Sequence, residues 1–264
     1  MTTFTDYMTI ANNLSRYQTM TADDPTVAQA TKYFQDNIGN IKSADDFVNN
    51  TRLFSYAMTA FGLSDMTYAK SLMKQVLEQG TTSSSALANK LANPKILAFA
   101  QAFKFALYGE STTQTIAATS DVVNKYVMQT LETNEGKQNA GVELALYFQQ
   151  NASKITDGYS ILADSKLLTV VQTTLGISSY TSAENVDLQA QQFDRLLTYS
   201  DFQDSSKVLN FLQRFTAEYD FSNPTASSSS STSLVTQLFD SSSNSSSGIS
   251  VNLMMSMQNL KLGG

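Results

Sequence analysis

The sequence predicts an all-α protein built from two tandem copies of one multi-helix unit. Apolar residues recur at steps of three and four along most of the chain, and the period-two alternation of half-buried strands is sustained nowhere. The second half also repeats patterns of the first half at spacings between 111 and 114 residues. With 42% hydrophobic residues among 264 positions, the chain can bury a sizeable core.

Helix boundaries can be placed along the first half. Asp24-Pro25 and Asn93-Pro94 each put a capping side chain before a proline at the first helical position, and Ser43 predicts a further start. The predicted stops are Gly39, Gly62 and Gly80. The predicted apolar faces are Val27, Ala30, Phe34 and Ile38; Phe47, Phe54, Met58 and Phe61; Leu72, Met73, Val76 and Leu77; and Ile96, Leu97, Ala100, Phe103 and Leu107.

The repeat is clearest around two aromatic residues. Tyr33-Phe34-Gln35-Asp36-Asn37 matches Tyr147-Phe148-Gln149-Gln150-Asn151 at an offset of 114. Further matched pairs are Gln18/Gln129, Leu53/Leu167, Phe61/Leu175, Gly62/Gly176, Leu63/Ile177, Lys95/Lys207, Phe99/Phe211 and Phe103/Phe215. Because the matches fall on apolar positions and helix stops, they predict a shared packing pattern and a pseudo-twofold helical body.

Four segments follow from these patterns. Residues 1–110 form the first helical unit and residues 111–220 form the second. Residues 221–248 are a serine-rich linker, which we expect to be flexible because it cannot bury enough apolar area to offset its ordering entropy. Residues 249–264 form a short amphipathic segment. The sequence leaves open whether the two units share one core.

Amphipathic stripes at both ends of the chain are candidate partner-binding surfaces. The candidate residues are Leu253, Met254, Met257 and Leu260 at the C-terminal end, and Phe4, Tyr7 and Leu14 at the N-terminal end. Each end either docks on the protein's own body or binds the other end or a neighbouring subunit. Docking on the protein's own body is favoured for the N-terminal stripe, because the repeat makes that stripe part of the first unit.

Composition excludes several classes of function. The chain has no Cys and no His, so disulfides, thiolate nucleophiles, imidazole bases and Ser-His-Asp triads are ruled out. A net charge of −6 disfavours binding to nucleic acid or to anionic membranes. No glycine-rich phosphate loop, calcium loop or membrane-length apolar run occurs. We therefore expect no cofactor, no metal, no membrane insertion and no catalytic residues.

Neighbouring carboxylates are the remaining candidates for chemistry. Each of these pairs is interpreted as lying at a helix start, where negative charge interacts favourably with the helix dipole. The pairs are Asp23-Asp24, Asp45-Asp46 and Glu132/Glu135. An enzyme that uses carboxylates alone stays a hypothesis. It requires inward-facing Asp or Glu residues from both units in one cleft.

Several stretches together resemble a known family. They are Tyr33 to Gly39, Ser43 to Phe47, Gly141 to Phe148, Phe211 to Phe215, and the ending from Gly248 to Gly264. These stretches resemble the DUF1217 proteins of alphaproteobacteria, which often contain two copies of the unit. The likeness extends over nearly the whole chain apart from the serine tract.

The resemblance implies a function that the residues alone do not give. Genes of this family lie among flagellar genes, and no catalytic residues are attached to the family. The resemblance therefore implies a non-enzymatic flagellum-associated structural or assembly protein that acts through apolar helix-mediated contacts, with flagellar components or with itself. The start of the chain lacks the basic and apolar regions of a cleaved signal peptide, so the alternative is a cytoplasmic scaffold or export chaperone for a flagellar component.

Overall fold

The computed structural model describes residues 2–178 and 185–223, and within these ranges all regular structure is helical. This confirms the predicted all-α fold class. The predicted C-terminal segment, and with it Leu253, Met254, Met257 and Leu260, lies outside the described residues, as does most of the predicted serine-rich linker.

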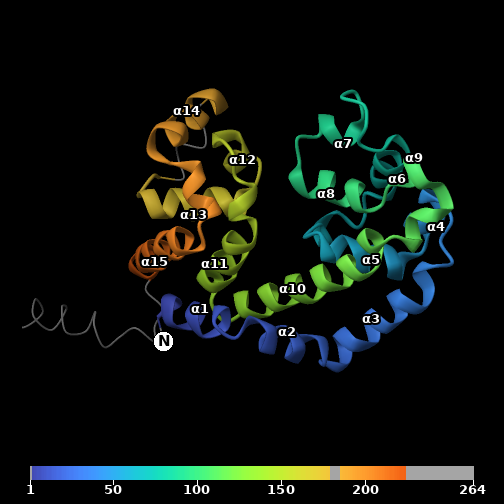
Figure 1. Ribbon diagram of the computed structural model, residues 1–264, viewed down its shortest axis with the longest axis horizontal. Coiled ribbons are helices and arrows are strands. Elements are labelled where there is room, and N and C mark those ends of the chain that lie inside the picture. Colours follow the sequence, from blue (N-terminus) through green and yellow to red (C-terminus); the bar gives the residue numbers. More distant parts are fainter. Residues whose placement is uncertain (1, 179–184, 224–264) are drawn as a thin grey trace, which may run out of the picture.

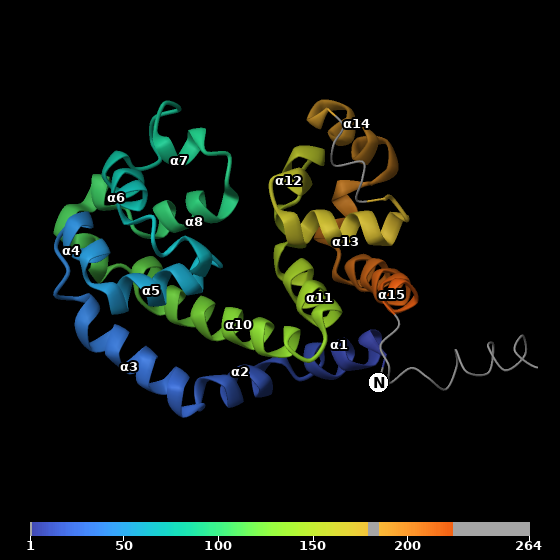
Figure 2. The ribbon, with the colours of Figure 1, turned by 180° about the vertical axis from the view of Figure 1, so that it is seen from behind.

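Two helical lobes rise on either side of one long helix, α10 (Ser120–Gly136), as Figures 1 and 2 show. The chain enters through α1 (Thr3–Ala11) and α2 (Leu14–Ala22), which run along the same edge as α10. The first lobe contains α3 (Pro25–Ile38), α4 (Ala44–Asn49), α5 (Thr51–Ala60), η1 (Ser64–Met66), α6 (Lys70–Gln79), α7 (Leu87–Lys90), α8 (Pro94–Ala102) and α9 (Phe105–Tyr108). The 3-10 helices η2 (Gly109–Gln114) and η3 (Ile116–Ala118) lead from there into α10.

The second lobe continues directly from α10. It contains α11 (Ala140–Asn151), η4 (Ala152–Lys154), α12 (Gly158–Leu162), α13 (Ser165–Leu175), α14 (Val186–Leu196), η6 (Tyr199–Gln203) and α15 (Ser205–Ser222).

The predicted helix starts are present. Asp24, Ser43 and Asn93 cap α3, α4 and α8, each accepting a hydrogen bond from a backbone N–H of the first turn. One boundary differs from the prediction: the apolar face after Pro94 was expected to reach Leu107. In the structure α8 ends at Ala102, and the Leu107 side chain is exposed.

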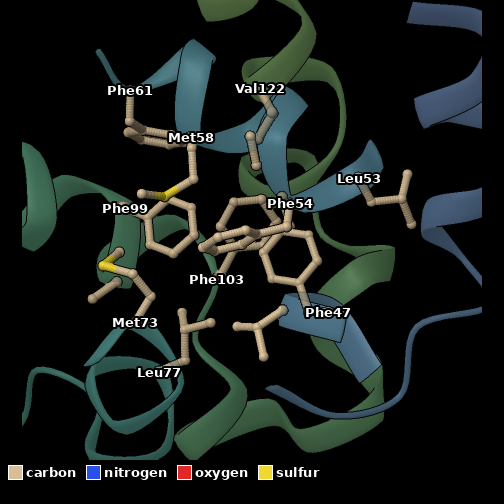
Figure 3. Packing of buried hydrophobic residues seen from close by; sticks show 14 of the residues in the cluster. Phe47, Leu53, Phe54, Met58, Phe61, Met73, Leu77, Phe99, Phe103 and Val122 are labelled. Atoms are coloured by element: carbon tan, nitrogen blue, oxygen red, sulfur yellow. The ribbon is translucent and has the colours of Figure 1, made fainter. Parts of the chain in front are cut away.

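Phenylalanine side chains fill the core of the first lobe (Figure 3). The ring of Phe47 lies with its centre 4.6 Å from that of Phe103, and Phe54 and Phe99 pack around the same point. All four side chains are fully buried. Burying a phenylalanine side chain contributes about 1.5–3 kcal/mol, so these four rings contribute strongly to the stability of the lobe.

The second lobe has a separate core, and α1 belongs to it. Phe148 and Phe215 are fully buried there together with Tyr7 and Ile10 of α1. The Thr3 backbone N–H donates to Asp220 Oδ2 at 3.0 Å, which ties the start of α1 to α15. The N-terminal stripe thus docks on the protein's own body, as favoured, but on the second lobe and not on the unit to which the repeat assigns it.

The first helix of the second unit, α10, in turn packs into the first lobe. Val122, near the start of α10, lies in the core of the first lobe, whereas Met128 and Leu131 lie in the core of the second. Between the lobes α10 packs against α2. Each unit therefore sends its first helical segment toward the other lobe, and the two lobes are joined by exchanged helices as well as by the connecting chain.

The two units share backbone detail at the predicted offset. The matched stops Gly62 and Gly176 have φ of +66° and +67°, a conformation that favours glycine. The matched hydrogen bonds are Leu63 N to Met58 O and Ile177 N to Gln172 O, both 2.8 Å, and Ile41 N to Ile38 O and Ile155 N to Ala152 O, at 3.1 and 3.0 Å.

Candidate functional site

The predicted N-terminal binding residues are used for packing inside the protein. Tyr7 is 1% exposed, and Phe4 and Leu14 are half-buried against the core of the second lobe. Burial of this kind leaves little of the stripe for a partner. Since the C-terminal candidates lie outside the described residues, a candidate site within the described part has to be found elsewhere.

A cleft of about 500 Å³ lies between the two lobes. Its base is α10, one wall is formed by the end of α5 and by α8, and the other wall is formed by α11, α12 and α13. The side chains that decide its chemistry are apolar (Phe61, Leu97, Met128, Leu167), amide (Gln101, Gln129, Gln150, Asn151), cationic (Lys95, Lys125, Lys154) and acidic (Glu132, Asp164).

Three lysines bring positive charge to the cleft from three different elements. Lys95 extends from the first lobe and places its ammonium nitrogen 3.9 Å from Asp164 Oδ2 of the second lobe. Lys154 donates to Asn151 Oδ1 at 2.8 Å, and burial together with the nearby charge of Lys125 lowers the pKa of Lys154. Within the described residues, neither Lys125 nor Lys154 has a carboxylate oxygen within 4.0 Å of its ammonium group.

Glu132 is a buried acid in this cleft, with a side chain that is only 3% exposed. Gln150 Nε2 donates to Glu132 Oε1 at 2.5 Å. Burial raises the pKa of Glu132 to about 7, although the positive charges of Lys166 and Lys95 oppose the shift. At neutral pH this carboxyl group is therefore divided between its protonated and ionised forms.

The position of Glu132 corrects the interpretation of the Glu132/Glu135 pair. The sequence placed these residues at a helix start, but α10 begins at Ser120, so both residues lie near its C-terminal end. Negative charge is not favoured by the helix dipole at that end. Capping therefore does not account for Glu132.

Asp164 is the second buried acid, and its oxygens already have partners. Its Oδ1 caps α13 by accepting from the backbone N–H groups of Lys166 and Leu167 at 2.9 and 3.2 Å. Its Oδ2 accepts a hydrogen bond from the Tyr147 hydroxyl. Burial and the neighbouring carboxylate raise the pKa of Tyr147, so the phenol stays neutral and acts as a donor.

The arrangement is better suited to binding than to carboxylate catalysis. The enzyme hypothesis required acidic residues from both units in one cleft, whereas Glu132 and Asp164 both belong to the second unit and the first lobe contributes a lysine. The adjoining hollow has an acid from each unit, Asp65 and Glu143, but Glu143 is paired with Lys166 at 2.6 Å. Apolar walls, side-chain amides and the ammonium groups of Lys125 and Lys154, which have no carboxylate partner among the described residues, together fit a ligand with apolar, peptide-like and anionic parts.

Family comparison assigns the chain. The family model described as "Protein of unknown function (DUF1217)" matches residues 60–208. This chain belongs to the DUF1217 family. A crystal structure of a structural genomics target from Agrobacterium tumefaciens is similar, with a TM-score of 0.79 and 39% sequence identity over 84% of this chain and 94% of that chain. No curated protein matches the chain significantly.

The DUF1217 match contains the whole lining of the cleft, from Ala60 to Leu167. Among the described residues of this family member, no group of three or more acidic side chains is placed to hold a metal ion. None of the helices in residues 2–178 and 185–223 has both the length and the apolar character needed to cross a bilayer.

Sequence reasoning missed the cleft, although one signal was present. At matched positions the second unit has Glu132 and Lys154 where the first unit has Thr21 and Asn40. A repeat that needs only packing does not need these charges, so such differences between copies point to the positions where the second unit does something more.

Proposed function

We propose that this DUF1217 protein is a non-enzymatic flagellum-associated structural or assembly protein that acts through contacts with other proteins. The observation that carries the proposal is the cleft between the lobes, whose apolar, amide and cationic lining comes from both lobes. Concave sites with apolar walls and a few polar groups are typical binding sites. The flagellar assignment is supported by membership of the DUF1217 family, because genes of this family lie among flagellar genes.

The decisive experiment is deletion of the gene in the native bacterium, followed by swimming assays and complementation. We expect impaired swimming that is restored by the wild-type gene. Wild-type swimming of the deletion strain in soft agar and in liquid would contradict the proposal. Immunoblots of purified hook–basal bodies, sheared filaments and cytoplasm then give the location of the protein.

The C-terminal stripe supplies a second test. Deleting residues 249–264 removes Leu253, Met254, Met257 and Leu260, which remain the predicted anchors for a partner. We expect loss of partner capture or of swimming while the far-UV circular dichroism of the helical body is unchanged. A truncated protein that supports full swimming would remove the tail from the proposal but leave the cleft.

A cytoplasmic scaffold or export chaperone is the second candidate. The feature that favours it is the presence of two lysines without a carboxylate partner among the described residues, Lys125 and Lys154, in the cleft of a chain of net charge −6, which suits transient capture of a segment of another chain. The fractionation experiment separates the two candidates. A structural component is found in purified flagellar structures, whereas a chaperone stays in the cytoplasmic fraction.

A further inference from the structure

We propose that the cleft between the lobes binds a short acidic segment of a partner protein, with carboxylates of that segment held by Lys125 and Lys154. The inference rests on the proposed function, because it names the chemistry of the segment that the protein captures. It is carried by the charges that face the cleft, by the rest of the lining and by the comparison of the two units.

The positive charges of the cleft are available, whereas its negative charges are not. Lys125 and Lys154 are solvent-accessible, although the Lys154 ammonium group is partly desolvated, and neither has a carboxylate within 4.0 Å in the described part of the chain. Asp164 and Glu132 are 4% and 3% exposed and accept hydrogen bonds from neighbouring side chains. A ligand entering the cleft therefore meets ammonium groups first, and charge-assisted hydrogen bonds to carboxylates are the strong contacts that they offer.

The remaining lining suits a peptide. Gln101, Gln129 and Asn151 offer amide groups that match peptide N–H and C=O groups, and Phe61 and Met128 offer apolar contact for side chains. A cleft of about 500 Å³ has room for a few residues.

The binding surface also extends further than a small anion requires. A second hollow of about 390 Å³ lies next to the cleft and shares Lys95 and Gln129 with it. Its lining holds Lys137 and Lys166 as well as Asp65 and Glu143, of which Glu143 pairs with Lys166 at 2.6 Å. Two adjacent hollows along one surface fit a chain segment better than a single small carboxylate.

The first unit shows that packing does not require these charges. By the repeat offsets, Lys125, Lys154 and Glu132 match Leu14, Asn40 and Thr21, none of which is charged. Asp164 likewise matches an uncharged residue, Asn50, so two lysines and two acids of the cleft are charges that the first unit lacks. Their common location between the lobes is explained by a ligand and not by the folding of the unit.

The test uses the full-length protein and a fluorescent peptide of about ten residues composed of Glu, Leu and Ala. Fluorescence anisotropy is expected to show binding that weakens as salt is added. The double variant Lys125→Glu, Lys154→Glu should bind about a hundredfold more weakly, which corresponds to about tenfold for each lost contact. A matched control, Lys42→Glu with Lys90→Glu, changes the net charge equally at exposed sites outside the cleft and should bind like wild type.

Four peptide-binding results would each overturn the inference. They are absence of binding, equal binding by the cleft variant, equal weakening by the control variant, and equal affinity for a peptide with Gln in place of Glu. Competition by glutarate at the same molar affinity as the peptide would also overturn it, in favour of a small dicarboxylate. If swimming depends on the gene but the peptide fails to bind, this inference falls and the proposed function stands. If the peptide binds but the deletion strain swims normally, the flagellar assignment falls.

Discussion

The matched tyrosines Tyr33 and Tyr147 each pack against the start of a later helix, and we call this contact the tyrosine corner. Its chemistry differs between the two lobes. In the first lobe, the guanidinium carbon of Arg52 lies 3.6 Å from the centre of the Tyr33 ring. Asn50 caps α5 by accepting from the Leu53 backbone N–H at 3.2 Å. The corner is neutral apart from Arg52, and its role is to hold α3 against the start of α5.

The matched corner of the second lobe keeps this geometry and adds a buried charge. Lys166 takes the place of Arg52, with its ammonium nitrogen 4.8 Å from the Tyr147 ring, and Asp164 takes the place of Asn50. Asp164 also accepts from the Tyr147 hydroxyl and faces Lys95 of the other lobe. The comparison teaches that the packing and the cation over the tyrosine ring were duplicated, while the buried carboxylate is present in the second lobe alone of these two matched corners.

The largest expected effect tests whether the two cores are equivalent. Phe34→Ala and Phe148→Ala each remove a fully buried ring at matched positions. Each should lower the free energy of unfolding by about 3–5 kcal/mol, measured by urea denaturation. Because the cores are separate clusters, faster amide hydrogen exchange should concentrate in the substituted lobe. Equal acceleration in both lobes would show one cooperative unit.

The next effect concerns Glu132, which has an uncharged counterpart in the first unit. Burial raises its pKa from 4.5 to about 7, so between these values the folded state holds a proton that the unfolded state has lost. Stability from this group should therefore fall as pH rises from about 4.5 to about 7, by about 3 kcal/mol in total. Glu132→Gln should remove this part of the pH dependence in denaturation curves, whereas Glu218→Gln at an exposed site should leave it. Parallel wild-type and Glu132→Gln curves would contradict the assignment.

A smaller effect separates the two helix caps. Asn50→Ala removes only a cap and should cost about 1 kcal/mol of unfolding free energy. Asp164→Ala also leaves the buried Tyr147 hydroxyl without its acceptor, so the cost should be about 2–4 kcal/mol. Thermal and urea denaturation of both variants measure the difference. Equal losses would mean that the hydrogen bond from Tyr147 contributes nothing to stability.

The smallest effect compares the matched lysines Lys95 and Lys207. Lys207 pairs with Asp201 at 2.7 Å on the surface, and Lys207→Met should change stability by less than about 0.5 kcal/mol. Lys95 is 22% exposed and bridges the lobes, so Lys95→Met should cost about 1 kcal/mol. The same Lys95 variant should widen the distance between spin labels placed on α8 and α12, since the contact across the cleft is lost. An unchanged distance would show that the lobes are held by packing alone.

Sequence could predict the fold because its determinants are local. Capping side chains such as Asp24 and Asn93 act on backbone groups two or three residues away, and apolar faces follow from helical spacing. The repeat added the tandem organisation. The sequence repeat assigns each helix to a unit, but it does not say on which lobe that helix packs. The docking of α1 on the second lobe was therefore not predicted.

The cleft could not be predicted because its parts meet only through the packing of the lobes. Lys95 and Asp164 are far apart in sequence and lie on helices with no local signal for their contact. α10 itself was hard to define from spacing, since Val122 faces one core while Met128 and Leu131 face the other. A helix shared by two cores does not show a single apolar stripe. For this reason the sequence pattern predicts a helix start at Glu132/Glu135, near what is in fact the C-terminal end of α10.

The tie between Thr3 and Asp220 has a consequence for biosynthesis. α1 packs on α11 and α15, and both of these helices belong to the second half of the chain. Until α11 and α15 have been synthesised, Tyr7 and Ile10 lack the native surface against which they are buried, so these apolar side chains stay exposed on the nascent chain while the first lobe is already complete.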